Sequence, residues 1–285
     1  MKSISFTGVI NAGGLATHMP ERVAPLGENG AVLKALARVG DPPISLIEHH
    51  VKYHLDNGAT NVIASVGPHE KVADHIKSQY RGHNSAGSFL VEHALGTGGD
   101  LLRLIRNREI AERIGSLIVI TNVDTIADVN LQNLAAFHRR FGGGLTIALS
   151  SRRGVPHEDA YRVGSYHRVV YSDEASDRTH TEQDAMPFTV YRGSSTGVMV
   201  ADTDFLRNVP WLPSDGSLSL YQDIVGYAVN QGVMTAFNNG DRFFMDVGTK
   251  ATWEKVQEPG LLRPFLHYPN SSVSLSPILG HHQDT

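Results

Sequence analysis

Two aspartates follow apolar segments and could bind a cation. Asp124 follows the run Leu-Ile-Val-Ile-Thr-Asn-Val, and Asp246 follows Arg-Phe-Phe-Met. Short apolar runs of this kind predict buried strands, so each carboxylate is expected at the edge of a sheet. Isolated carboxylates suit a hard cation such as Mg²⁺, which keeps several water ligands. Either aspartate could instead be the N-cap of a helix, and the sequence leaves that alternative open.

A glycine-rich turn follows the first apolar segment of the chain. It has the sequence Asn-Ala-Gly-Gly-Leu-Ala-Thr-His over 11–18. No Gly-Lys-Ser/Thr follows, so the turn is not a P-loop, and its glycines lack the spacing of the dinucleotide-binding fingerprint. These glycines would let backbone N–H groups approach an anion closely at the carboxyl end of a strand. A turn that only ends a strand would use the same glycines.

The composition is that of a globular protein and excludes several chemistries. The 285 residues are 41% hydrophobic and 19% charged, which is enough to bury a core. A net charge of −4 provides no bulk positive field for nucleic acid or an anionic membrane. Without cysteine, the chain forms no disulfide, thiolate zinc site, iron–sulfur cluster or cysteine nucleophile. With no signal-peptide pattern and no long apolar span, we expect a cytoplasmic location.

The elements that must position these residues alternate between strand and helix in the first half of the chain. Strands are predicted at 4–10, 61–66, 88–92 and 117–121, and helices at 44–57, 69–80, 97–113 and 131–141. In the first helix apolar residues recur at roughly helical spacing, and Gly58 follows as a C-cap. This alternation indicates an α/β fold with a Rossmann-like, mixed but mainly parallel sheet flanked by helices.

The second half of the chain predicts strands with little helix between them. These strands are at 145–150, 161–171, 188–191 and 196–200. The polar, acidic segment 173–184 is predicted to be a loop. One domain is therefore expected over 1–258, divided into halves at about 1–143 and 144–258. Residues 259–285 are rich in Pro, Ser and His and lose periodicity, which predicts a C-terminal extension.

Six short motifs in collinear order resemble those of the sugar-1-phosphate nucleotidyltransferases. They are Gly13-Gly14-Leu15-Ala16-Thr17-His18, Leu33-Lys34, Glu92-His93-Ala94-Leu95-Gly96-Thr97-Gly98-Gly99, Thr121-Asn122-Val123-Asp124, Ser195-Thr196-Gly197 and Phe244-Met245-Asp246-Val247-Gly248-Thr249. The family has Gly-Gly-x-Gly-Thr-Arg, Pro-Lys, Glu-x-x-x-Leu-Gly-Thr-Ala/Gly-Gly, Asn-Gly-Asp, Asn-Ala-Gly and Trp-x-Asp-Ile-Gly-Thr at these places. The resemblance covers about 9–256 and implies the fold of the nucleotide-diphospho-sugar transferases.

The resemblance implies a Mg²⁺-dependent nucleotidyl transfer. A sugar 1-phosphate, or a similar cyclitol phosphate, would attack the α-phosphorus of a nucleoside triphosphate in line and release pyrophosphate. Such an enzyme mainly positions two polyanions and neutralises developing charge. The first half of the chain would bind the nucleotide and the second half the sugar phosphate. The Leu-Gly-Thr-Gly-Gly turn is similar to that of guanylyltransferases, which favours GTP; a homo-oligomer is left open.

The resemblance also assigns roles to individual residues. Asp124 and Asp246 would bind Mg²⁺, and Lys34 would reach the triphosphate; a solvated lysine beside Arg38 is the alternative for Lys34. The residues that would contact the nucleotide are Ala12, Gly13, Gly14, Thr17, Leu95, Gly96 and Thr97. The residues that would contact the sugar phosphate are Glu92, Asn122, Thr196, Gly197 and Arg162.

Two departures from the family pattern concern phosphate binding. His18 replaces an arginine that binds the triphosphate. Imidazole is only partly protonated at neutral pH and lacks the paired N–H donors with which a guanidinium group binds phosphate. Arg22 in the same segment could supply the missing guanidinium. The chain also has no lysine between Lys77 and Lys250 to bind the sugar phosphate. An arginine must serve instead, and the candidates are Arg162, Arg168, Arg178 and Arg192.

Two other classes of function are left open. A regulatory subunit could bind a sugar nucleotide without turning it over, although it would have little need of the metal pair Asp124 and Asp246. A glycosyltransferase of related fold would carry an Asp-x-Asp motif, which Asn122-Val123-Asp124 does not supply. The fold alone does not decide between these classes, because this architecture supports many chemistries.

Overall fold

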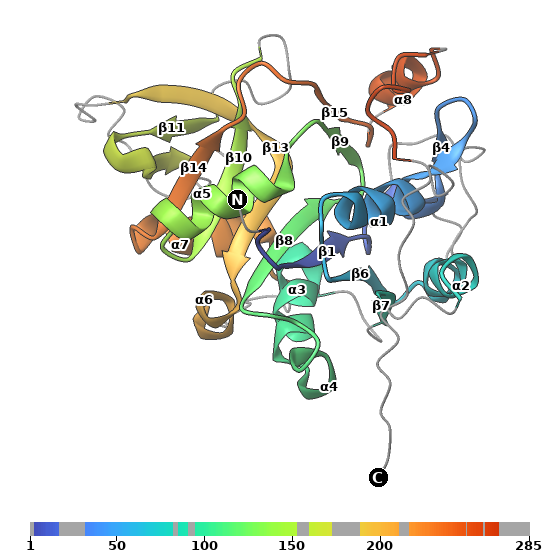
Figure 1. Cartoon of the computed structure of the whole chain (residues 1–285), viewed down its shortest axis with the longest axis horizontal. Helices are drawn as coiled ribbons and strands as arrows, with labels where there is room; N and C mark the ends of the chain where they lie inside the picture. Colours follow the sequence, from blue (N-terminus) through green and yellow to red (C-terminus); the bar gives the residue numbers. More distant parts are fainter. Residues whose placement is uncertain are drawn as a thin grey trace.

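The structure is a computed structural model with a mixed sheet covered by helices on both faces (Figure 1). It describes residues 3–16, 32–81, 85–90, 95–152, 160–172, 189–210, 217–248, 250–258 and 260–267. The predicted α/β class is confirmed, with a parallel centre to the sheet and antiparallel strands beside it.

The main sheet has nine strands and runs through both halves of the chain. Its order is β12 (Val169–Ser172), β11 (Tyr161–Val163), β13 (Tyr191–Asp202), β8 (Leu117–Asn122), β1 (Thr7–Asn11), β6 (Asn61–Gly67) and β7 (Ala86–Leu90), with β10 (Leu145–Ser150) and β14 (Met234–Asn238) branching from β13. The strands β7, β6, β1 and β8 are parallel, whereas β13 is antiparallel to β8. The carboxyl ends of the four parallel strands therefore share one edge of the sheet.

Helices and short ladders complete the fold. The helices are α1 (Leu46–Asp56), α2 (Glu70–Gln79), α3 (Gly96–Arg106), α4 (Arg108–Ala111), α5 (Leu131–Phe141), α6 (Thr203–Asn208), α7 (Gly226–Asn230) and α8 (Lys250–Val256). In addition there are two 3₁₀ turns, η1 (Lys34–Leu36) and η2 (Ser165–His167), and one π-helical segment, η3 (Leu220–Val225). Two-stranded ladders join β2 (Leu15–Ala16) to β3 (Val32–Leu33), β4 (Arg38–Val39) to β5 (Ile44–Ser45), and β9 (Thr125–Ala127) to β15 (Phe244–Asp246).

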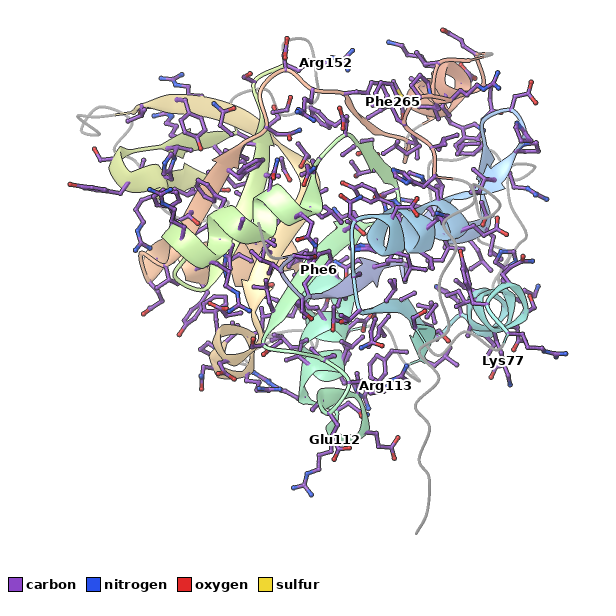
Figure 2. All side chains as sticks on the ribbon, viewed as in Figure 1. Phe6, Lys77, Glu112, Arg113, Arg152 and Phe265 are labelled. Carbon is purple, nitrogen blue, oxygen red and sulfur yellow. The ribbon has the colours of Figure 1, made fainter. Side chains whose placement is uncertain are left out.

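The strands at the centre of the sheet are buried on both faces. Ile10 of β1 packs in one hydrophobic core with Ile47 of α1, whereas the neighbouring Val9 packs in a second core with Leu101 of α3. Figure 2 shows Phe6, a member of the first core, in the interior of the molecule. Successive residues of a strand point to opposite faces, so a strand covered on both sides is apolar throughout. This explains the unbroken apolar run that predicts β1.

Local signals in the sequence fix the ends of α1. Ser45 is the N-cap, and its hydroxyl accepts a hydrogen bond from the Glu48 backbone N–H while the Glu48 carboxylate accepts from the Ser45 N–H. This reciprocal capping box satisfies two backbone donors at the start of the helix. Gly58 follows the helix with φ of 85°, a conformation that favours glycine. The C-cap itself is Asn57, so the predicted glycine lies one residue past it.

Three predicted elements are wrong in their extent. The predicted strand 161–171 is two strands, β11 and β12, joined by a turn in which Tyr166 and His167 have φ of 56° and 62°. The predicted helix 97–113 ends at Arg106, because Asn107 leaves the helical conformation and its side chain caps α4. The first strand starts at Thr7 rather than at residue 4. The predicted loop 173–184 and residue 188 lie outside the described residues.

The first part of the predicted C-terminal extension packs on the domain. Leu262 and Leu266 are buried, and the Phe265 ring stacks on Phe243 with ring centroids 4.0 Å apart. Figure 2 shows Phe265 at the periphery beside the C-terminal helix. In addition, His267 Nδ1 lies 2.7 Å from Asp56 Oδ2 of α1. Within the described part of the chain, no helix is long and apolar enough to span a membrane.

The close approach of α1 to β1 depends on a glycine. A Cβ on Gly8 would lie 2.6 Å from Cγ and Nδ1 of the buried His54. We expect Gly8→Ala to lower the free energy of unfolding by about 1–3 kcal/mol, the usual cost of overpacking a core. On the edge strand β7, a Cβ on Gly87 meets open space, so Gly87→Ala should change it by less than about 0.5 kcal/mol. Urea unfolding of both variants measures the difference, and equal stabilities would contradict this packing.

Candidate functional site

The parallel strands bring the predicted site segments to one edge of the sheet. Asn11 at the end of β1 is in register with Ser65 of β6 and with Asn122 of β8. The glycine turn follows Asn11, and the turn that carries Asp124 follows Asn122. Both turns therefore lie side by side at the carboxyl edge, where open α/β sheets bind ligands.

The ladder of β9 with β15 brings the two predicted metal ligands together. Figure 1 shows these two strands side by side, although they are far apart in the sequence. Asp246 pairs with Thr125, the neighbour of Asp124. The Val247 N–H also donates to the Asp124 carbonyl oxygen at 2.7 Å. The two carboxylates are thus held on adjacent pieces of backbone.

Lys34 joins the two carboxylates around Gly248. Its Nζ donates to Asp124 Oδ2 at 2.9 Å. A Cβ on Gly248 would lie 3.0 Å from Asp246 Oδ1, 3.1 Å from Asp124 Oδ2 and 3.2 Å from Lys34 Nζ. Two carboxylate oxygens and an ammonium group therefore face one small space that the missing side chain leaves open. Sequence reasoning assigned no role to Gly248, although it lies within the last of the six motifs.

The contacts of Asp124, Asp246 and Lys34 test the alternative roles, a cap for each aspartate and a solvated side chain for the lysine. Asn130, not Asp124, caps the helix that follows β9. Asp246 does cap a turn, because its Oδ1 accepts from the Gly248 N–H at 2.7 Å. The Lys34 side chain is 18% exposed and paired with Asp124, so it is not a solvated lysine. Arg38 instead donates to the carbonyl of Pro43.

The donor set fits a hard divalent cation. Carboxylate oxygens are the ligands that Mg²⁺ prefers, and it commonly takes one or two of them together with water and substrate phosphates. Among the described residues, no three or more His, Asp or Glu side chains gather as a larger metal cluster. Asp124 has a side chain 26% exposed, so a ligand can approach it. The pair Asp124 and Asp246 thus suits a cation whose remaining ligands come from solvent or substrate.

The two glycines of the first turn have different surroundings. A Cβ on Gly13 would lie 3.0 Å from the Gly67 backbone nitrogen, so the turn packs tightly on the end of β6. A Cβ on Gly14 would have no atom within 4 Å. Ala12 is buried, and its N–H donates to the Ser65 carbonyl at 2.8 Å. Gly13 is therefore needed by the fold, whereas Gly14 faces open space.

Asp100 joins the glycine turn to the start of α3, and sequence reasoning missed it. Its Oδ1 accepts from the Leu95 N–H at 2.9 Å, and its Oδ2 would lie 3.3 Å from a Cβ on Gly13. His69 Nε2 is 3.2 Å from the Gly13 carbonyl oxygen on the other side of the turn. Burial raises the pKa of the Asp100 carboxyl above its ordinary value, and the hydrogen bond from Leu95 offsets only part of that rise. A carboxylate directly after the Leu-Gly-Thr-Gly-Gly turn was the available signal.

The Leu-Gly-Thr-Gly-Gly turn packs against the segment 217–220. The N–H groups of Gly98 and Gly99 donate to the Leu218 carbonyl at 2.8 and 3.0 Å. The Thr97 hydroxyl accepts from the Leu220 N–H at 3.0 Å. Gly96 has φ of 78° and would place a Cβ 2.6 Å from the Leu218 carbonyl oxygen. The turn thus links the two halves of the chain, a contact that the motif alone did not indicate.

The predicted sugar-phosphate residues differ in what their side chains already contact. Asn122 Nδ2 donates to the Tyr221 hydroxyl at 2.9 Å. Thr196 is buried, and its hydroxyl donates to the Ala148 carbonyl at 2.9 Å. Gly197 has φ of 73°, and a Cβ there would lie 2.8 Å from Thr125 Oγ1, next to Asp124. Asn122 and Gly197 therefore lie beside the carboxylate pair, while the Thr196 hydroxyl is bonded within the protein.

The arginines proposed to replace the family's lysine lie in different places. Arg162 of β11 stands directly opposite Arg192 of β13, so both occupy one face of the sheet. Arg168 lies by the amino ends of β10 and β14, where its guanidinium donates to the Gly232 carbonyl. That position, at the edge opposite the carboxylate pair, argues against Arg168. The predicted site residues Thr17, His18, Arg22, Glu92 and the candidate Arg178 lie outside the described residues.

The raised pKa of Asp100 makes a prediction about stability and pH. A carboxyl group whose pKa is raised by folding destabilises the folded protein when it is ionised. This destabilisation is complete above the folded-state pKa and absent below the unfolded-state pKa, which is near 4. Asp100→Asn retains an oxygen to accept from Leu95, so we expect it to gain stability over wild type at pH 7 and to lose that gain as the pH falls toward 4. Urea unfolding at several pH values measures this. The exposed Asp74→Asn is the control, and a gain that grows on acidification would contradict the assignment.

Comparison with solved structures shows that this fold is shared. HddC from Yersinia pseudotuberculosis has a TM-score of 0.60 at 16% identity, covering 89% of this chain and 98% of that one. The same protein complexed with GMP-PN has a TM-score of 0.59 at 17% identity, with 89% and 98% covered. A Bacillus anthracis protein described as a glucose-1-phosphate thymidylyltransferase, in complex with a sucrose, has a TM-score of 0.62 at 18% identity, with 89% and 94% covered. The sequence matches no protein-family model and no curated protein. The chain therefore has the fold of these proteins.

Proposed function

We propose that this protein is a sugar-1-phosphate nucleotidyltransferase, which condenses a nucleoside triphosphate with a sugar 1-phosphate. The observation that carries the proposal is the convergence of Lys34, Asp124 and Asp246 on the space in front of Gly248. These groups lie at the carboxyl edge of a sheet whose fold is shared with a protein described as a glucose-1-phosphate thymidylyltransferase. An ammonium group, together with a cation held by the two carboxylates, would neutralise charge in a reaction between two polyanions.

Asp124 and Asp246 would hold Mg²⁺ in this reaction. When bound, the ion supplies positive charge that stabilises a phosphoryl-transfer transition state. Lys34 would hydrogen-bond phosphate oxygens through its ammonium group, which already lies beside Asp124. The missing side chain of Gly248 keeps the space between these groups open.

The glycine turn and the start of α3 would bind the triphosphate and nucleoside. Among the described residues, no backbone carbonyl accepts from the N–H groups of Gly13 and Gly14, so these donors can serve an anion. Asp100 and His69 would hold the turn in this conformation. The complex of HddC with GMP-PN supports a guanine nucleotide, and we propose GTP as the preferred substrate.

The proposed chemistry is an in-line exchange at phosphorus. An oxygen of the sugar phosphate forms a bond to the α-phosphorus while the bond to the bridging oxygen breaks, and pyrophosphate leaves with that oxygen. The protein's part is to align the two substrates and to neutralise charge. Asn122 and Gly197, beside the carboxylate pair, would contact the sugar phosphate, and Arg162 remains the proposed partner for its charge.

The direct test is a panel of the five common nucleoside triphosphates against several sugar 1-phosphates. Pyrophosphate release is measured with Mg²⁺ and with a chelator. We expect release with at least one pair of substrates and none with the chelator. Nucleotide binding without release for any pair would overturn the proposal and favour the regulatory subunit.

Removing either carboxylate should abolish most activity. We expect Asp124→Asn and Asp246→Asn each to lower turnover by at least about a hundredfold, because each removes charge stabilisation from the transition state. Asp128→Asn is the matched control, since that carboxylate is about half exposed and pairs with Arg242 at 3.6 Å. Turnover is measured at saturating Mg²⁺, and a variant that keeps wild-type turnover would remove that aspartate from the site.

A side chain at Gly14 should block the nucleotide without harming the fold. A Cβ there meets no protein atom within 4 Å, so we expect Gly14→Val to keep wild-type stability. Nucleoside triphosphate affinity, measured by calorimetry, should fall by at least about tenfold, because the valine would occupy space needed by the phosphates. Gly115→Val, also in open space, should bind as wild type. Unchanged affinity in a folded Gly14→Val protein would exclude this turn from the site.

A further inference from the structure

Two buried polar side chains at the ends of β1 and β6 lack hydrogen-bond partners. Asn11 and Ser65 are paired in register near the carboxyl ends of these strands, and they are 8% and 1% exposed. Neither Asn11 Nδ2 nor Ser65 Oγ has a hydrogen-bond partner among the described residues. Leaving such a group buried and unpaired costs free energy of folding, so each case requires a specific explanation.

The neighbouring strands do not satisfy the Asn11 side chain. On one side Ser65 is itself unpartnered. On the other side Asn122 is in register with Asn11, but its Nδ2 donates to the Tyr221 hydroxyl at 2.9 Å. The backbone carbonyl of Asn11 does accept from the Val123 N–H at 3.1 Å, so the main chain of this residue is held in place. The side-chain amide donor is the part of Asn11 that the described residues leave unused.

The Asn11 side chain lies on the face of the sheet that α3 covers. Val9, two residues earlier in β1, packs in the second core with Leu101 of α3, and residues two positions apart in a strand share a face. The glycine turn follows Asn11 directly. Asp100 joins that turn to the start of α3. Asn11 therefore lies next to both segments that are proposed to bind the nucleotide.

We propose that the carboxamide of Asn11 recognises the base of the nucleoside triphosphate. This inference rests on the proposed function and deepens it, because it names a residue that selects the nucleotide. The carboxamide is neutral, which suits a base rather than a phosphate. Its N–H donor and carbonyl acceptor are coplanar, and they match the coplanar donors and acceptors along the edge of a base. Asn11 was not among the nucleotide-contacting residues that the sequence motifs indicated.

Burial makes such a contact selective. The correct base would pair with the Asn11 amide, whereas a base without the matching group would leave the amide unpaired in a site shielded from water. Without the nucleotide, the unpaired amide lowers the stability of the fold. An amide kept for a ligand therefore lowers stability and raises selectivity, and the two effects can be measured separately.

The test replaces the carboxamide with an apolar group of nearly the same shape. Calorimetry measures the affinities of wild type and Asn11→Leu for GTP, ATP, UTP, CTP and dTTP. We expect the variant to bind the triphosphate that wild type prefers, which is expected to be GTP, about 5- to 10-fold more weakly, the effect of one lost neutral hydrogen bond. The other four affinities should change less than about twofold, because those bases do not make this bond. Urea unfolding should show Asn11→Leu to be at least as stable as wild type.

Two further variants control for packing. Asn11→Ala removes the same carboxamide without adding apolar volume, so it should lose the same selectivity. Thr7→Val is the matched control at the other end of β1. Thr7 lies on the same face as Asn11 and is buried, and its hydroxyl also has no partner among the described residues. Thr7→Val should leave all five affinities as in wild type.

The outcomes separate this inference from the proposed function. Unchanged selectivity in folded Asn11→Leu and Asn11→Ala proteins overturns the inference, and so does an equal loss of affinity for all five triphosphates. If wild type binds a triphosphate but releases no pyrophosphate with any sugar 1-phosphate, the proposed function fails and the affinities still test Asn11. Pyrophosphate release together with unchanged selectivity overturns the inference alone. Binding of none of the five to wild type would overturn both.

Discussion

Parallel pairing of β1 with β6 and β8 is the constraint on which the rest of the site depends. It brings the ends of three strands to one edge, so short turns after each strand meet there. The glycine turn packs on Gly67 at the end of β6, and the Asp124 turn follows β8. The carboxylate of Asp246 joins them because β15 pairs with β9, directly after Asp124. A site made of such turns on a buried sheet is held by rigid elements, which favours precise positioning of substrates.

The underside of the Asp124 turn is packed with neutral histidines. His50 and His54 of α1 are buried, and desolvation lowers their pKa values to about 4 and about 3, so both are uncharged at neutral pH. His54 Nε2 lies 3.0 Å from the Thr121 hydroxyl, and the His50 ring lies against the backbone of Val123 and Thr125. The uncharged form avoids burying an unpaired charge, although Nδ1 and Nε2 of His50 and Nδ1 of His54 have no hydrogen-bond partner among the described residues. The positive charge near Asp124 therefore comes from Lys34, on the open side of the turn.

The two halves of the chain are joined at the site by polar contacts as well as by the shared sheet. Asp100 links the glycine turn to the start of α3, and the residues after Leu95 bond to the segment before Tyr221. A ligand held by the nucleotide turn would therefore lie close to the residues that contact the acceptor. Because an in-line transfer depends on alignment of two bound molecules, such coupling between the two binding regions serves the proposed reaction.

Local patterns in the sequence determined the elements, and tertiary structure decided what met at the site. Helix 131–141 and strand 145–150 were predicted to the residue, because periodicity and caps act between near neighbours. The hairpin in 161–171 was missed. Its turn depends on φ values of 56° and 62° at Tyr166 and His167, and these residue types do not indicate such a conformation. Motif resemblance indicated Lys34, Asp124 and Asp246, but it could not show Gly248 between them or Tyr221 beside Asn122. Asn122 and Tyr221 are 99 positions apart, and Lys34 and Asp124 are 90 positions apart. Only strand pairing and packing bring such residues within hydrogen-bond distance.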